Sequence, residues 1–171
     1  MLSTGYMKTI RTLMIATVLA ANGAVFAHTD APQDAKSARK AISTEEKAFG
    51  REGDPKKVSR TVTVDMSDKM RYSPASLTVR QDETVRFVVK NSGKVMHEMV
   101  LGTMQELKEH AELMKKHPGM EHDEPYMAHV APGKTERVVW QFTRLGEYYY
   151  GCLIPGHFEA GMIGRINVNA R

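Results

Sequence analysis

Three side chains that bind soft or borderline metals lie close together near the C-terminus of this 171-residue chain. Cys152 is the only cysteine, and His157 and Met162 follow it at intervals of five residues. Pro155 and two glycines interrupt the segment, so it can fold as a loop that directs all three side chains to one point. Thiolate, imidazole and a weak thioether, completed by a second imidazole, form the donor set of a mononuclear blue-copper site.

The second imidazole is predicted to come from His97, which lies in a separate apolar segment. Zinc is the less suitable ion, because it prefers closed sets of Cys and His and gains little from a thioether. The alternative is a buried free cysteine beside an unrelated His and Met, since lone cysteines are often core residues. We favour copper, because three such donors at loop spacing rarely coincide by chance. The predicted copper ligands are therefore His97, Cys152, His157 and Met162.

The N-terminus has the pattern of a signal peptide, predicted to span residues 1–27. Two basic residues precede an apolar run over residues 13–21, and Ala27 ends a small-residue cleavage site. The run is too short for a transmembrane helix. We therefore expect export to the periplasm without stable membrane insertion. An unpaired thiol is a liability in an oxidising compartment, so export also favours a copper ion on Cys152.

The charge of the chain gives little reason to expect a nucleic-acid partner. The predicted signal peptide holds two of the 24 basic residues and none of the 20 acidic ones, which leaves a formal charge of +2. No basic block or aromatic–basic stripe interrupts this near balance. The exported part is long enough for one domain with a real core, and we expect a monomer.

Residues 28–57 are predicted to form a flexible polar arm. They are rich in Ala, Lys, Glu, Asp and Ser, and Ile42 and Phe49 are their only large apolar side chains. Such a composition buries too little surface to offset the entropy of ordering the chain.

The remainder of the chain, residues 58–171, alternates apolar and polar residues with the period of β-strands. Val85, Phe87 and Val89 fall on one face, and Tyr148 and Tyr150 share parity with the cysteine, which places them in the core. Further strands are predicted over residues 58–66, 76–80, 138–142 and 162–169. Many short strands in about 110 residues indicate an all-β sandwich.

One segment departs from this pattern and is predicted to be a helical insertion at about residues 103–126. Thr103 and Glu106 form a capping box, which indicates a helix that runs to about Lys116. Its expected apolar stripe consists of Met104, Leu107, Ala111 and Met114.

The C-terminal copper loop and two upstream segments resemble those of cupredoxins, the blue-copper family that includes plastocyanin, azurin and auracyanin. The similar segments are Gly146–Cys152, Pro155–His157 and Gly161–Val168, with Tyr72–Val79 and Glu83–Asn91 upstream. The four-residue gaps on both sides of the loop His are similar to auracyanin-type proteins. The resemblance implies an eight-stranded Greek-key sandwich with copper at one end and one exposed imidazole edge. The expected fold is thus an all-β Greek-key cupredoxin sandwich with one inserted helix.

Glu98 is a departure from this family, because plastocyanin-like proteins usually carry Asn directly after the first ligand His. A carboxylate at this position can accept hydrogen bonds beside the metal, or can add proton-linked behaviour. We therefore predict that Glu98 acts in the outer sphere of the copper.

The insertion is unusually rich in histidine and methionine, with four of each between Met104 and His129. Imidazole and thioether donors favour Cu(I) and tolerate Cu(II), so a second, weaker copper site is chemically reasonable. Met104 and Met114 have an alternative role in the helical core, as methionines in helices often do. The candidates for the second site are therefore His117, Met120, His122 and Met127.

Two functions fit these residues. The leading one is an exported blue-copper protein that carries single electrons between redox partner proteins. The alternative is a periplasmic copper-tolerance protein that exchanges copper with copper-handling proteins and buffers it through the blue-copper site and the insertion. An enzyme is disfavoured, because multicopper oxidases and copper nitrite reductases need further domains with additional His ligands, and a binuclear copper centre needs two cysteines.

Overall fold

The computed structural model describes residues 41–117 and 122–171. The predicted signal peptide, the first part of the predicted arm and Met120 lie outside the described residues. The elements are, in chain order, β1 (Glu46–Lys47), β2 (Gly50–Glu52), β3 (Arg60–Ser67), β4 (Arg71–Ser73), β5 (Ser76–Arg80), β6 (Thr84–Asn91), β7 (His97–Gly102), α1 (Met104–Lys116), β8 (Met127–Val130), β9 (Thr135–Gln141), β10 (Gly146–Gly151) and β11 (Ile163–Asn169).

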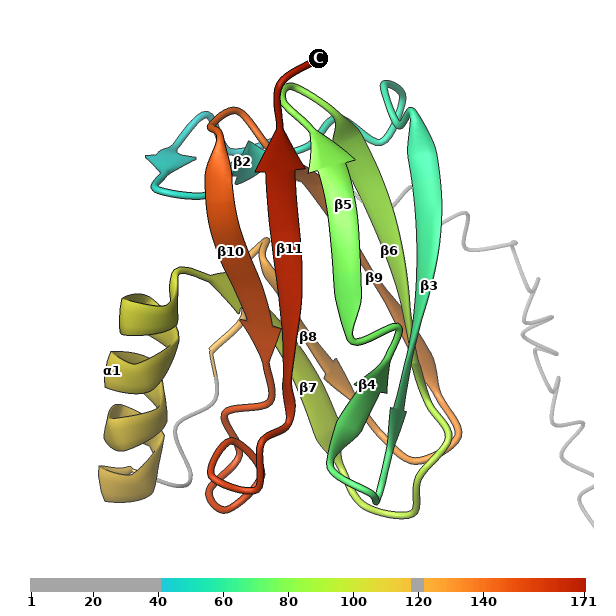
Figure 1. Ribbon diagram of the computed structural model, residues 1–171. Helices are drawn as coiled ribbons and strands as arrows, with labels where there is room; N and C mark the ends of the chain where they lie inside the picture. The colour runs from blue at the N-terminus through green and yellow to red at the C-terminus, as the bar shows by residue number, and fades with distance from the viewer. Residues whose placement is uncertain (1–40, 118–121) are drawn as a thin grey trace, which may run out of the picture. The chain divides into compact units, whose positions relative to one another are not determined.

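The strands form two sheets that pack face to face (Figure 1). One sheet has the order β1-β2-β9-β6-β3-β4 and the other the order β5-β11-β10-β7-β8. The pairs β3–β6 and β5–β11 are parallel, while the other pairs are antiparallel. The all-β sandwich with a single helix is confirmed. Of the eleven strands in the described residues, three have only two or three residues, so eight longer strands form the body.

Alternation along the strands produces the core between the sheets, as the sequence predicts. Val85, Phe87 and Val89 are fully buried, while Lys90 is exposed on the other face of β6. Trp140 of the neighbouring strand β9 is buried opposite Val85. Each such side chain contributes about 1.5–3 kcal/mol when it leaves water.

Helix α1 begins and ends as the sequence predicts and lies between β7 and β8 in the chain. The Thr103 side chain accepts the N–H of Glu106, whose carboxylate accepts the N–H of Thr103 in return. The buried stripe of the helix packs on β7 and on Leu153, the residue directly after the cysteine. The insertion is therefore attached to the segment that is predicted to bind copper.

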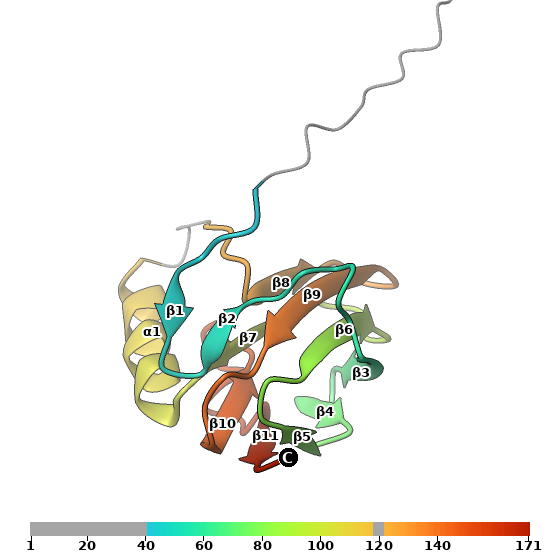
Figure 2. The same ribbon diagram turned by 90° about the horizontal axis from the view of Figure 1, so that it is seen from above.

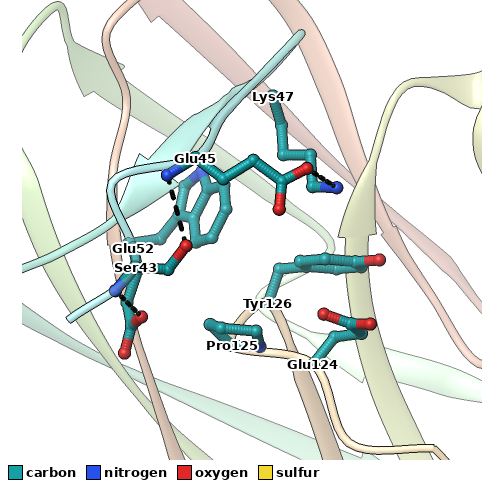
Figure 3. Close-up of a pocket in the computed structure, with 8 residues that line it drawn as sticks. Ser43, Glu45, Lys47, Glu52, Glu124, Pro125 and Tyr126 are labelled. Carbon is teal, nitrogen blue, oxygen red and sulfur yellow. Dashed lines mark hydrogen bonds and ion pairs between the residues drawn. The ribbon is translucent and has the colours of Figure 1, made fainter. Parts of the chain in front are cut away.

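The flexible-arm prediction is wrong for residues 41–57, which join the domain. Phe49 is buried, stacks on Trp140 at a centroid distance of 5.0 Å and accepts the indole N–H through its carbonyl oxygen. The hairpin β1–β2 adds to the edge of the sheet beside β9 (Figures 1 and 2). Figure 3 shows polar side chains of this segment around a pocket beside Tyr126, where Lys47 pairs with Glu45 at 2.5 Å and lies over the tyrosine ring. A buried aromatic side chain and strand pairing together hold this polar segment on the domain.

We expect Phe49→Ala to lower the free energy of unfolding by about 3–5 kcal/mol, the usual cost of truncating a buried aromatic side chain. Urea unfolding followed by the fluorescence of Trp140, the single tryptophan, measures this directly. Ile42→Ala is the matched control, since Ile42 is 41% exposed and its loss should cost within about half a kcal/mol. If both substitutions had equally small effects, residues 41–57 would not contribute to the stability of the domain, as expected for a flexible arm.

Candidate metal centre

One predicted ligand lies on strand β7, and the other three lie on the loop between β10 and β11. His97 is the first residue of β7, and Cys152 follows the last residue of β10. Because β10 pairs antiparallel with both β7 and β11, the start of β7 and the loop between β10 and β11 lie at the same end of the sandwich (Figure 1). The loop that carries His157 and Met162 therefore folds back beside His97.

Backbone hydrogen bonds give the loop its shape. The N–H of Cys152 donates to the carbonyl of Met162 at 3.1 Å, and the N–H of Met162 donates to the carbonyl of His157 at 3.1 Å. Gly156 turns the chain with φ of +90°, a conformation that favours glycine. The positions of the predicted donors are thus fixed by the main chain as well as by packing.

Three of the predicted donors converge. One ligand atom each from His97, Cys152 and His157 lies within 4.8 Å of the others, and no other such trio of His, Cys, Asp or Glu occurs among the described residues. Cys152 Sγ is 3.2 Å from His157 Nδ1, and the two imidazole rings are 5.0 Å apart. Met162 is fully buried in the same core cluster as Cys152. His157 is partly exposed, so one imidazole reaches the surface.

His97 carries a polar atom whose position fits a metal ligand. Its side chain is fully buried, and its Nδ1 has no hydrogen-bond partner among the described residues. Its Nε2 lies 3.3 Å from Oδ1 of Asp68. A histidine that ligates a metal through one nitrogen usually has its other nitrogen held by a carboxylate in this way. Sequence reasoning missed Asp68, because nothing in the local pattern indicates a contact across 29 residues.

Glu98 is buried and follows His97 directly in the chain. Its Oε1 accepts the N–H of Leu153 at 2.6 Å, and its Oε2 lies 3.0 Å from Nε2 of His129. The backbone N–H groups of Glu98 and Ile154 lower the pKa of the Cys152 thiol, against the larger effect of burial, and so favour its thiolate. Hydrogen bonding around the Cys sulfur is one of the ways in which proteins set the potential of such a copper.

Burial controls the protonation of the donors. It raises the pKa of the Cys152 thiol to about 12, so the metal-free protein holds a neutral thiol that a metal must deprotonate. The pKa of His157 is lowered, first by burial and then by the nearby His97. A neutral imidazole is the form that binds a metal, so this shift prepares His157 for coordination.

Three of the four candidates for the second site, His117, His122 and Met127, lie among the described residues. Met127 opens β8 and is buried in the cluster beneath α1, which gives it a packing role in the core. Its burial against Leu107 and Met114 explains its type without a metal. His117 is exposed at the C-terminal cap of α1. Met120 lies outside the described residues. His122 lies beside another histidine, His110.

His122 lies in a group of histidines that the sequence prediction did not assemble. Its ring is 4.8 Å from the ring of His110 on α1, and its Nδ1 is buried without a hydrogen-bond partner among the described residues. Burial and the nearby His122 lower the pKa of His110, which is also within electrostatic range of Glu98 and His129. We call His110, His122 and His129 the histidine cluster. A helix face, a loop and a strand meet here, so spacing in the sequence gives no sign of it.

Comparisons with known proteins identify the family of the chain. Residues 58–169 match the family model described as copper binding proteins, plastocyanin/azurin family. The chain therefore belongs to this family, the cupredoxins, and it binds copper.

Relatives within the family include two proteins named copper-resistant cuproprotein CopI. The one from Rubrivivax gelatinosus is 53% identical over 120 residues, which cover 70% of this chain and 73% of that protein. The one from Pseudomonas aeruginosa is 33% identical over 150 residues, or 71% of this chain and 82% of that protein. A solved structure of reduced auracyanin from Roseiflexus castenholzii is similar in fold, with a TM-score of 0.57, 20% identity and coverage of 66% of this chain and 98% of that chain.

In the described part of the chain, no helix is long and apolar enough to cross a membrane.

We expect Asp68→Ala to weaken copper binding by about 10–100-fold, the usual effect of removing an outer-sphere carboxylate that orients a ligand histidine. Competition for Cu(II) against a chelator of known affinity measures the change. Asp65→Ala is the matched control, because Asp65 accepts a hydrogen bond from Ser92 on the adjoining loop, while it is Asp68 that contacts His97. Equal losses in the two variants would show that loop stability, and not orientation of His97, determines the affinity.

Proposed function

We propose that this chain is an exported, non-enzymatic blue-copper protein whose single copper alternates between Cu(II) and Cu(I). Cys152, His97 and His157 supply the strong donors, and Met162 supplies the weak axial one. The observation that carries the proposal is the convergence of a buried thiol, a partly exposed imidazole and the unpartnered Nδ1 of His97 at one point. Copper is the only component not supplied by the chain, and a bound ion would deprotonate the thiol and accept both imidazoles.

Electron transfer follows from the shape of the site. Cu(II) prefers tetragonal surroundings and Cu(I) trigonal or tetrahedral ones, so a site fixed between them reduces the rearrangement that accompanies gain or loss of an electron. The exposed edge of His157 is the point at which a redox partner protein would exchange that electron. Val95 and Met96, directly before His97, are 44% and 46% exposed and add apolar surface at that end of the chain's β7 strand.

A second function, copper tolerance in the periplasm, is favoured by a specific observation. Two relatives are named copper-resistant cuproproteins, and the histidine cluster provides a second group of donors beside the copper centre. A protein that buffers copper or passes it on needs capacity beyond one ion. The candidates for binding the additional copper are His110 and His122, with His129 nearby.

The visible spectrum tests the proposed copper ligands. We expect an intense thiolate-to-copper charge-transfer band in the Cu(II) protein, and Cys152→Ser should abolish it together with nearly all tight binding. Met162→Leu should retain copper and raise the reduction potential, because a weak donor that favours Cu(II) is lost. Met66→Leu, at another fully buried methionine, is the control and should leave the potential unchanged. A colourless wild-type protein with one Cu(II) bound contradicts the assignment.

Titration with Cu(I) separates the carrier from the copper-tolerance protein. If the chain has extra capacity, the wild type should bind more than one Cu(I), and His110→Ala with His122→Ala should remove the weaker equivalent while leaving the visible band intact. Lys108→Ala with Glu112→Ala, on the exposed side of the same helix, is the matched control. One equivalent of Cu(I) in both the wild type and the histidine variant would leave electron transfer as the sole function.

A further inference from the structure

We propose that Glu98 is an outer-sphere carboxylate shared by two metal sites, so that a divalent cation on the histidine cluster raises the reduction potential of the copper. The inference rests on the proposed function in one respect, since it requires copper at Cys152. It adds a property that neither electron transfer nor copper buffering requires, namely an energetic coupling between the two sites. Glu98 would then be a positioning residue for both metals.

On the copper side, Glu98 is held in place by its carboxylate and its backbone. The carboxylate accepts the N–H of Leu153, the residue directly after Cys152, at 2.6 Å. The Tyr72 hydroxyl donates to the backbone carbonyl of Glu98 at 2.6 Å. The side chain is 3% exposed, so its charge is poorly screened by water. A change in the charge of this carboxylate is therefore felt at the thiolate.

On the other side, the second oxygen of Glu98 faces the histidine cluster. Oε2 lies 3.0 Å from Nε2 of His129, which is the cross-strand partner of Glu98 in the β7–β8 ladder. The second nitrogen of His129, Nδ1, lies 3.7 Å from the exposed carboxylate of Asp123. A metal on Nδ1, with the Nε2 proton donated to Glu98, would give the carboxylate–histidine–metal arrangement that proteins use to orient a ligand histidine.

The other donors of such a site are already close to one another. The rings of His110 and His122 are 4.8 Å apart, and Nδ1 of His122 is buried without a hydrogen-bond partner in the described part of the chain. Imidazoles with one carboxylate suit Zn(II) and Cu(II). The cluster is not preformed to the degree of the copper centre, because within the described residues only His97, Cys152 and His157 have three ligand atoms within 4.8 Å. Binding must therefore draw His110, His122 and His129 together.

The direction of the effect follows from charge. A cation on Nδ1 makes the Nε2–H of His129 a stronger donor, which draws electron density of Glu98 away from the copper side. Less negative charge beside the thiolate favours the added electron of Cu(I), so the reduction potential rises. We expect the Cu(II)/Cu(I) equilibrium to shift about tenfold, within the usual range of coupling between sites. For a one-electron couple this is about 59 mV.

The experiment uses the copper-loaded full-length protein and Zn(II), which has no redox chemistry of its own. Spectroelectrochemistry at the charge-transfer band gives the potential without and with saturating Zn(II), and calorimetry gives Zn(II) binding. The wild type should bind Zn(II) and show the upward shift. By linkage, the reduced protein should bind Zn(II) about tenfold more tightly than the oxidised one.

Three variants separate the possible outcomes. His110→Ala with His122→Ala should lose the shift together with Zn(II) binding at the cluster. Glu98→Gln keeps an oxygen that can accept the N–H of Leu153 but removes the negative charge. His129→Gln keeps Glu98 and removes the imidazole that links it to the cation. Both should lose most of the shift, and His129→Gln, which leaves the copper side of Glu98 in place, should remain blue. Glu112→Gln, an exposed carboxylate on α1, is the control and should keep it.

Each contrary result has a defined meaning. Absence of Zn(II) binding, or binding with an unchanged potential, overturns the coupling while the blue colour leaves the copper assignment intact. An undiminished shift in both Glu98→Gln and His129→Gln would show that the cation acts through space, and it would overturn the role of Glu98. A colourless copper protein would instead refute the proposed function on which the inference rests.

Discussion

The structure of this cupredoxin depends on the pairing of β10 with β7 on one side and with β11 on the other. This double pairing places His97 and the loop from Cys152 to Met162 at the same end of the sandwich, although they are more than fifty residues apart in the sequence. The buried tyrosines of β10 pack in the core and fix the register. A slip of one residue would turn Tyr148 and Tyr150 toward solvent and separate the donors.

The burial that fixes the positions of the donors also keeps their polar atoms away from water. The pKa of the Cys152 thiol is raised by burial to about 12, and Nδ1 of His97 is buried without a hydrogen-bond partner in the described part of the chain. An unpaired buried polar group such as this nitrogen destabilises a fold by about 1–3 kcal/mol. A bound copper would remove that penalty, so copper binding and stability are linked. The fold and the metal therefore support each other.

The sequence predicts most of the fold and the core of the site, because these depend on local periodicity and on donor types. The alternation in β6, the capping box of α1 and the loop donors are local signals, and the structure contains each element. The contacts that the sequence does not predict join distant segments. Phe49 is ordered by Trp140, Asp68 reaches His97, and Met127 is buried beneath α1. No short-range pattern in the sequence encodes these three contacts.

We propose that the chain holds copper in one pre-shaped site that changes little between oxidation states. X-ray absorption at the copper edge, recorded on the Cu(II) and Cu(I) forms of the singly loaded protein, tests this proposal. We expect the same donors in both forms, one thiolate sulfur and two imidazole nitrogens, with only small changes in bond length. Loss of the thiolate or of an imidazole in either form, or a change in coordination number on reduction, would contradict it.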